Sequence, residues 1–239
     1  PEAFEEIIWH AFWPEKYTDT NIVLWGEDDN KTESQDFFVE HMKKIIALRC
    51  RERMREARYI SKNNANIARL DLLPQVFPGA RILVPVRHPL EHAASLLQQH
   101  HNFITMHRNE PFSRRYMADL GHYEFGELHR PIAFPGHDAL IADLDPMAVD
   151  YWLGYWIAAY EYVLVRRDSV IPVSYEAMCT DGQSTLEEVM GRLDIDNNGV
   201  LSSAANILRP PPRPRRDNFL FNPLLRERAE ALYKSLLSV

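Results

Sequence analysis

The stretch Arg81-Ile-Leu-Val-Pro-Val-Arg-His-Pro-Leu90 decides the fold. Its apolar residues from Ile82 to Val86 are typical of a short buried strand, which ends at Arg87. Pro89 suits the first turn of a helix, because its fixed φ fits there and its missing N–H is not needed. The pattern therefore predicts a strand that carries a guanidinium at its carboxyl end and is followed at once by a helix.

The carboxyl end of such a strand favours an anion site. Ligands of open α/β sheets bind at this edge, and a helix N-terminus offers N–H groups and the positive end of its dipole to anions. Arg87 adds a planar group suited to phosphate or sulfate, and Ser95, two turns into the helix, adds a hydroxyl. From these residues alone two interpretations stay open, an anion site or a surface arginine in an ordinary salt bridge.

A second unit of the same kind precedes the first. Residues Ala57 to Ser61 predict another strand, which ends at Lys62. The helix after it has three candidate capping residues, Asn63, Asn64 and Asn66. Phe77-Pro-Gly-Ala80 then predicts the turn into the strand of Arg87. Two successive strands that each end in a cation before a helix favour the anion site.

Together these segments resemble the sulfotransferase family that uses 3′-phosphoadenosine 5′-phosphosulfate. The resemblance covers residues 57–106 well and residues 168–195 loosely. It is carried by Ser61-Lys62-Asn63, by Phe77-Pro78-Gly79-Ala80-Arg81, by Val86-Arg87-His88-Pro89 with Ser95, and by Val173-Ser-Tyr175-Glu176-Ala-Met178. It implies an α/β fold in which a three-layer parallel sheet is flanked by helices, as in P-loop nucleoside triphosphate hydrolases.

The resemblance also implies an activity and a set of site residues. The enzyme would move a sulfuryl group from this donor, its co-substrate, to a hydroxyl or amine acceptor. Arg87 and Ser95 would bind the 3′-phosphate of the donor, and Tyr175 would lie near its adenine. Lys62 would lie near the phosphosulfate bridge and offset the charge that builds on the leaving oxygen.

One part of the family pattern has no counterpart in the sequence. The family opens with a strand and a glycine-containing loop that holds the 5′-phosphosulfate. Either the chain begins after that loop or its 5′ site is built otherwise, and we expect the first. The consequence expected of such an N-terminally truncated chain is poor donor binding and lost activity.

The first residues predict a short amphipathic helix. Its apolar spacing uses Phe4, Ile7, Ile8 and Phe12, with Trp9 and Trp13 on its flank. Three acidic residues lie near its start, Glu2, Glu5 and Glu6. Such residues usually complement the helix dipole. In several branches of the resembled family, however, a glutamate soon after the phosphate loop is the general base.

The general base therefore has several candidates. The resemblance would give Glu2 or Glu5 this role, and His10 is a further candidate. His100 or His101 is another, because histidine titrates near neutral pH. The sequence does not choose between the histidines.

Composition and charge limit the number of domains, the class of protein and its location. The 239 residues are 46% hydrophobic and 26% charged, which predicts one globular domain over residues 1–239. The formal charge of −7 argues against a general nucleic-acid-binding protein. Only two cysteines are present, which favours a reducing, cytoplasmic location. We expect no membrane span in the chain, and the oligomeric state is not indicated.

Residues 107–146 are rich in aromatic residues and predict a long irregular segment. Such a segment inside a compact domain is often a functional lid, so we interpret it as an insertion on the acceptor side. The alternative is a packed connection. Its aromatic residues suit a small phenol, a lipid, a glycan or a peptide tyrosine as acceptor. The histidines here match no metal-ligand spacing, and we expect no metal.

Residues 209–216, Arg-Pro-Pro-Pro-Arg-Pro-Arg-Arg, differ in composition from the rest of the chain. Prolines favour an extended segment. It could be a ligand for a recognition module, a linker, or a loop that closes over an anion. Several relatives in the resembled family use a basic C-terminal loop on the 3′-phosphate, which would make Arg213 and Arg215 donor-binding residues.

Two alternative functions remain open. The chain could be a nucleotide-dependent phosphotransferase on a similar fold, although the GxxxxGK[ST] loop and acidic magnesium ligand of that class are not visible. It could also be a non-catalytic binding protein that recruits partners through residues 209–216.

Overall fold

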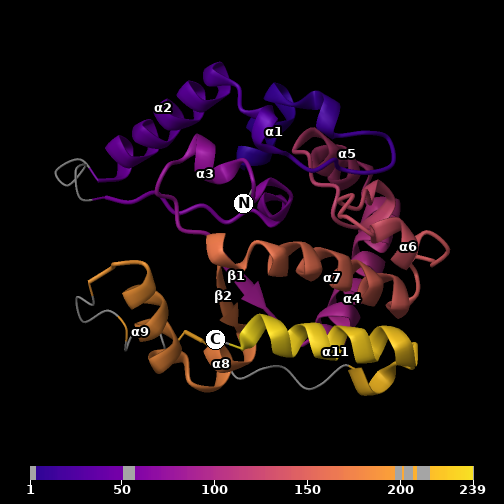
Figure 1. Ribbon diagram of the computed structural model, residues 1–239. Helices are drawn as coiled ribbons and strands as arrows, with labels where there is room; N and C mark the ends of the chain where they lie inside the picture. The colour runs from indigo at the N-terminus through magenta and orange to yellow at the C-terminus, as the bar shows by residue number, and fades with distance from the viewer. Residues whose placement is uncertain (1–3, 51–56, 197–200, 202–206, 209–215, 239) are drawn as a thin grey trace. The chain divides into compact units, whose positions relative to one another are not determined.

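The computed structural model describes residues 4–50, 57–196, 201, 207–208 and 216–238 (Figure 1). The chain divides into two compact units. Unit 1 comprises Pro1–Ala80 and Phe103–Phe134, and unit 2 comprises Arg81–Asn102 and Pro135–Val239. The single domain over residues 1–239 stays a prediction.

Unit 1 is mainly helical and has an aromatic core. Its helices are α1 (Phe4–Phe12), α2 (Thr32–Arg49), a 3₁₀ helix (Asn64–Arg69), α3 (Leu73–Val76), the last turns of α4 (Pro89–Asn109) and α5 (Pro111–Asp119). The ring centroid of Trp9 lies 4.9 Å from that of Trp13 and 4.5 Å from that of Phe38. Aromatic contacts of this kind add to the free energy gained by burial.

The buried face of α1 differs from the predicted one. The helix itself is confirmed at Phe4–Phe12. However, Trp9 and Trp13, predicted to lie on the flank, are only 1% and 0% exposed, whereas Ile7 is 41% exposed. The buried stripe includes the charged residue Glu6. A pattern of apolar residues could not reveal this face, because it depends on a distant partner for the carboxylate.

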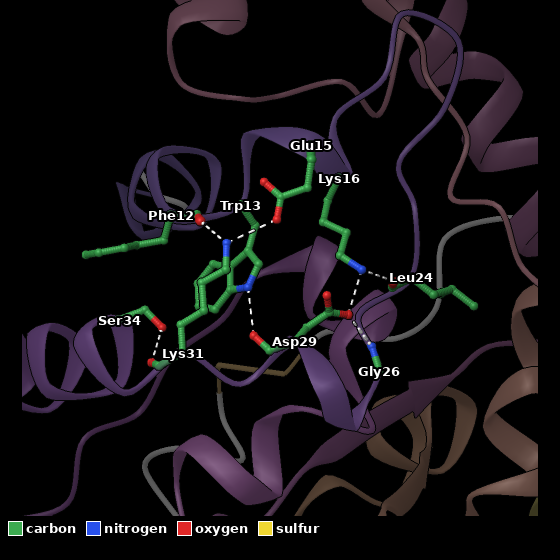
Figure 2. A network of polar contacts seen from close by, with 9 residues as sticks. All are labelled: Phe12, Trp13, Glu15, Lys16, Leu24, Gly26, Asp29, Lys31 and Ser34. Carbon is green, nitrogen blue, oxygen red and sulfur yellow. Dashed lines mark hydrogen bonds and ion pairs between the residues drawn. The ribbon is translucent and has the colours of Figure 1, made fainter.

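Polar groups of the loop between α1 and α2 form hydrogen bonds with one another (Figure 2). The Lys16 ammonium donates to the Asp29 carboxylate at 2.6 Å and to the Leu24 carbonyl at 3.0 Å. The same carboxylate accepts from the Gly26 N–H at 2.7 Å, and the Trp13 indole donates to the Asp29 carbonyl at 2.9 Å. These bonds fix the loop. It supplies the side chains of Tyr17 and Trp25, which contact the buried ion pair described below.

Unit 2 contains a parallel pair of strands packed by helices. Its elements are β1 (Leu83–Val86), the first turns of α4, α6 (His137–Ile141), α7 (Val149–Val165), β2 (Ile171–Ser174), α8 (Tyr175–Thr180), α9 (Gly182–Arg192) and α11 (Pro223–Leu237). β1 pairs with β2 in parallel, with Leu83 opposite Ile171 and Val86 opposite Ser174. The long helix α11, yellow in Figure 1, packs along α7 and contacts both strands.

The strand and helix predicted from the deciding stretch are confirmed. β1 falls within the predicted Ile82–Val86, and α4 begins at Pro89. Twelve of the seventeen residues of α7 are buried, so this helix forms the centre of the apolar core in unit 2. The parallel pairing of β1 and β2 brings their carboxyl ends to the same edge.

The predicted strand at Ala57–Ser61 is wrong. No strand is assigned at residues 57–63, and the sheet formed by the described residues has two strands, not the several of a three-layer core. An extended segment becomes a strand only where a neighbour completes its ladder of hydrogen bonds. Here side-chain bonds from α1 hold the segment, as described below.

Residues 107–146 are also less irregular than predicted. Helices α5 and α6 lie in this range. Pro111 occupies the first turn of α5, and Gly136, with a φ of 75°, directly precedes α6. Prolines and glycines that looked like loop residues therefore mark the ends of helices.

Gly126 offers a test of the packing in unit 1. Its φ is 73°, and an added Cβ would lie 2.7 Å from Nδ1 of His107 and 2.9 Å from Cβ of Phe103. We expect Gly126→Ala to lower the free energy of unfolding by about 2–4 kcal/mol, because strain and overpacking add. Urea denaturation measures the change.

Gly79 provides the matched control. Its φ is 84°, but an added Cβ would meet nothing within 4 Å. Gly79→Ala should therefore lower the free energy of unfolding by only about 1 kcal/mol, because only the strain of a positive φ remains. Equal losses in the two variants would contradict the close packing around His107.

Candidate functional site

In unit 2, two predicted donor-binding residues meet at the carboxyl edge of the strand pair. The Arg87 guanidinium, which follows β1, lies over the Tyr175 ring, which follows β2, at 5.0 Å from the ring centroid. Both side chains are half-buried. Ser95 lies in the second turn of α4 and is also half-buried. The structure thus places a cation and an aromatic ring together at the edge where ligands of such sheets bind.

The N-terminus of α4 is partly occupied by a carboxylate. The His88 N–H donates to Oε1 of Glu176 at 2.9 Å, and the Tyr233 hydroxyl donates to Oε2 at 2.9 Å. One N–H group predicted for an anionic ligand therefore already has an anionic partner. Glu176 was not among the predicted site residues. The available signal was its position directly after Tyr175, at the end of β2.

Two histidines beside Arg87 are neutral at physiological pH. Burial, with repulsion from Arg87, lowers the pKa of His92 to about 4. Burial and the charge of Arg216 also lower the pKa of His88. The positive charge at the start of α4 therefore comes from Arg87 and not from these imidazoles.

A pocket of about 440 Å³ opens beside the first turn of α4. It is lined by Leu90, Arg216, Asp217, Phe219, Leu220, Phe221, Arg226 and Glu230. Nε of Arg216 lies 3.6 Å from Oε1 of Glu91. Arg87, Ser95 and Tyr175 are not among its lining residues. Arg213 and Arg215, predicted for the same ligand, lie outside the described residues.

In unit 1, α1 holds the segment that carries Lys62. Oε1 of Glu5 accepts from the Tyr59 hydroxyl at 2.5 Å, and Oε2 accepts from the Ser61 hydroxyl at 2.5 Å. Lys62 itself is exposed. Glu5, one predicted catalytic residue, therefore bonds to the segment that carries Lys62, another predicted catalytic residue. Glu2, the third, lies outside the described residues.

Glu6 forms a buried ion pair with Arg69. The two residues are only 2% and 0% exposed. Oε1 of Glu6 accepts from Nη2 of Arg69 at 2.5 Å and from the Tyr17 hydroxyl at 2.5 Å, and Oε2 accepts from Asn63 at 2.6 Å. Arg69 keeps the pKa of Glu6 below its ordinary value although burial acts the other way. Glu6 is therefore ionised at neutral pH.

Two tryptophans enclose the guanidinium of this pair. The Arg69 carbon Cζ lies 4.4 Å from the ring centroid of Trp9 and 4.3 Å from that of Trp25. A desolvated cation between two indoles gains cation–π energy that partly offsets its lost hydration. The sequence did not predict this pair, because Glu6 and Arg69 are separated by 63 positions.

His122 forms a second polar pair near this network. Its Nδ1 lies 3.4 Å from Oε2 of Glu124, and this contact raises the pKa of His122. The negative charge of Glu6 also raises that pKa, whereas the positive charge of Lys62 lowers it. His122 is therefore an electrostatic neighbour of both residues, although the sequence did not single it out as a base.

The other candidate bases are His10 in unit 1 and His100 and His101 in unit 2. The ring centroid of His10 lies 4.6 Å from that of Tyr17. His100 is buried with its ring centroid 5.3 Å from that of Trp152, and burial lowers its pKa. His101 is half-buried. These contacts are typical of aromatic packing.

Residues 12–198 match the sequence model of the sulfotransferase family. The chain belongs to this family. The match confirms the resemblance drawn from the sequence, and in the sulfotransferase family an α/β fold and a group-transfer activity are expected. A search of curated proteins and a search of solved structures each found no match.

The family match includes Lys62, Arg87, Ser95 and Tyr175, but Glu5 and Glu6 precede it. Within the described part of the chain, no group of three or more potential ligand residues could hold a metal ion. None of the described helices is long and apolar enough to span a bilayer.

The buried pair predicts a large effect of removing one charge. Arg69→Met keeps much of the side-chain volume but leaves the Glu6 carboxylate buried and without its cation. We expect a loss of about 3–5 kcal/mol in the free energy of unfolding, measured by urea denaturation near neutral pH. Lys43→Met, which breaks the exposed pair with Glu40, is the matched control and should leave the midpoint unchanged. Similar midpoints for the two variants would contradict the burial of the pair.

The contact between His122 and Glu124 predicts a pH dependence. Because folding raises the pKa of His122, the stabilisation is complete below the ordinary value of 6.5 and is lost as pH rises through the folded value. His122→Asn should therefore lower the melting temperature more at about pH 5.5 than at about pH 8.5. Glu124→Gln should remove the same pH dependence. A constant difference between wild type and His122→Asn over this range would refute the assignment.

Proposed function

We propose that this sulfotransferase moves a sulfuryl group from 3′-phosphoadenosine 5′-phosphosulfate to a hydroxyl or amine acceptor. The family match supports sulfuryl transfer. The donor is proposed from the anion-binding chemistry of the residues that the family motifs contain. The same motifs lead us to propose a P-loop-like core with a parallel sheet.

The observation that carries the donor assignment is the contact between Arg87 and Tyr175. A guanidinium at the carboxyl edge offers two parallel N–H donors to a phosphate, and an aromatic ring beside it offers a surface to a base. The donor contains both groups. Arg87 and Ser95 would bind its 3′-phosphate, and Tyr175 would contact its adenine.

The chemical step needs one cation and one base. The acceptor oxygen forms a bond to sulfur while the bond from sulfur to the phosphate oxygen breaks, and negative charge builds on that leaving oxygen. The Lys62 ammonium would stabilise this charge, and a carboxylate or histidine would take the acceptor proton. The family pattern offers Glu2 and Glu5 as candidates for this carboxylate. Most of the rate enhancement would come from positioning and electrostatics.

The acceptor is proposed as a small molecule, a glycan or a peptide that presents a hydroxyl or amine. Residues 107–146 are the proposed acceptor side, since α5 carries exposed aromatic residues. Phe112 is 77% exposed and Tyr116 is 43% exposed. Their rings are stacked, with 5.9 Å between the ring centroids. An exposed aromatic pair suits a sugar ring or a phenol as a partner.

Calorimetric titration of 3′,5′-bisphosphoadenosine into the full-length protein tests the donor site. This compound is the product left by the donor. We expect Arg87→Ala to weaken binding by about 10- to 100-fold, because a charge-assisted bidentate contact to phosphate is lost. Binding by wild type that Arg87→Ala leaves unchanged would show that the site lies elsewhere.

Arg81→Ala is the matched control. Arg81 precedes β1, pairs with Asp194 at 3.4 Å and is exposed, so its removal should not change the affinity. Magnesium-dependent binding of ATP in place of bisphosphoadenosine would instead favour a phosphotransferase. If neither compound binds, the donor assignment fails.

A further inference from the structure

We propose that Glu5 and Glu6 are positioning residues that hold Lys62 in place. We call Glu5, Glu6, Tyr59, Ser61 and Asn63 the acidic clamp. The inference rests on the proposed function, because it assumes that Lys62 acts on the leaving group. It assigns both carboxylates to structure around Lys62 and not to proton transfer.

The clamp depends on the alternating directions of side chains along an extended segment. Side chains at every second position of such a segment point the same way. Tyr59, Ser61 and Asn63 all donate to carboxylates of α1, at 2.5, 2.5 and 2.6 Å. The intervening residue Ile60 is 84% exposed. Lys62, the next intervening residue, is also exposed.

The clamp brackets Lys62 in sequence. Ser61 before it is bonded to Glu5, and Asn63 after it is bonded to Glu6. Asn63 is also the cap of the following 3₁₀ helix, since its Oδ1 accepts from the Ala65 N–H at 2.9 Å. Both neighbours of Lys62 are thus fixed by bonds that start from one turn of α1.

The second carboxylate of the clamp is itself immobile. Glu6 is held by Arg69, which lies between two tryptophan rings and also donates to the Asn66 side chain at 3.1 Å. A buried carboxylate paired with a cation resists displacement, because movement away from that cation leaves an uncompensated buried charge. The hydrogen bond between Glu6 and Asn63 therefore links the buried core of unit 1 to the Lys62 segment.

Carboxylates suit this role better than neutral side chains. Glu5 accepts from two hydroxyls at once, one on each oxygen, whereas a glutamine has only one accepting oxygen. Both oxygens of Glu5 already accept from donors on the Lys62 segment. The geometry therefore favours a positioning role over the role of general base.

Removing the donors separates the two roles. In the double variant Tyr59→Phe with Ser61→Ala, Glu5 remains but its bonds to the segment are gone. A positioning role predicts a fall in kcat of about 10- to 100-fold, because a small displacement of a catalytic group is costly. If Glu5 is the general base, this variant should keep its kcat, since the carboxylate is intact. That result would overturn the proposal.

Glu5→Gln is the complementary variant. It keeps one of the two accepting oxygens, so a positioning role predicts a partial loss of kcat and a pH profile whose acidic side is retained. A general base predicts that kcat is nearly abolished and that the acidic side of the profile disappears. Glu15→Gln changes an exposed glutamate paired with Lys31 and is the matched control, with kcat and pH profile unchanged.

Limited trypsin digestion tests the clamp without any activity. Breaking the clamp should speed cleavage after Lys62 several-fold in the double variant and in Glu5→Gln, because a loosened segment enters a protease more readily. Cleavage after the exposed Arg81 is the internal reference and should not change. Equal rates after Lys62 in wild type and variants would refute the clamp.

The two measurements also separate this inference from the proposed function. A full-length protein that neither binds bisphosphoadenosine nor transfers sulfuryl groups would refute the proposed function. The digestion result would still decide whether Glu5 and Glu6 hold the Lys62 segment. An active wild type with unaltered kcat in the double variant would refute the positioning role alone.

Discussion

The buried ion pair between Glu6 and Arg69 is the interaction on which unit 1 depends. Taking both charges out of water costs several kcal/mol per ion, and their attraction alone does not always repay it. Here further partners share the cost. Tyr17 and Asn63 bond to the carboxylate, and two indole rings enclose the guanidinium. Because these partners come from α1, the loop after it, the extended segment and the 3₁₀ helix, the pair joins four parts of the chain.

Unit 2 uses a different means to fix its functional residues. Backbone pairing of β1 with β2 sets the positions of Arg87 and Tyr175, and the apolar helix α7 supplies the core beneath them. Its main polar link at this edge is Glu176, which joins the start of α4 to Tyr233. Regular secondary structure therefore places the proposed anion-binding residues, whereas side-chain bonds place Lys62 in unit 1.

This difference explains which parts of the chain the sequence could predict. β1 and α4 follow from local patterns, because the apolar run from Ile82 to Val86 and Pro89 act within a few residues. The residues 57–61 have the same local pattern as a strand but form none. Whether an extended segment gains a ladder depends on a neighbouring strand, and that information is not local.

The buried face of α1 was unpredictable for a related reason. An apolar pattern places Ile7 inside and leaves Glu6 at the surface, because an isolated buried carboxylate is strongly unfavourable. Only Arg69, 63 positions later, makes the opposite arrangement stable. Arg69 itself lies in an apolar stretch, where a single arginine gives no sign of its partner. Lys62, Arg87 and Tyr175 were predicted because the resemblance gives each of them a role. Glu176 lies in the same motif as Tyr175 but was given no role, and His122 lies in none of these motifs.

The same energetics bear on the role of the acidic residues at the start of α1. Acidic residues there usually complement the helix dipole, which is worth only a few tenths to about 1 kcal/mol. Glu5 and Glu6 each make stronger, charge-assisted contacts to the segment around Lys62. A dipole effect would need neither two consecutive carboxylates nor donors at alternate positions of a segment more than 50 residues away. The arrangement instead suits a chain that fixes a proposed catalytic cation on an extended segment without a β-ladder of its own.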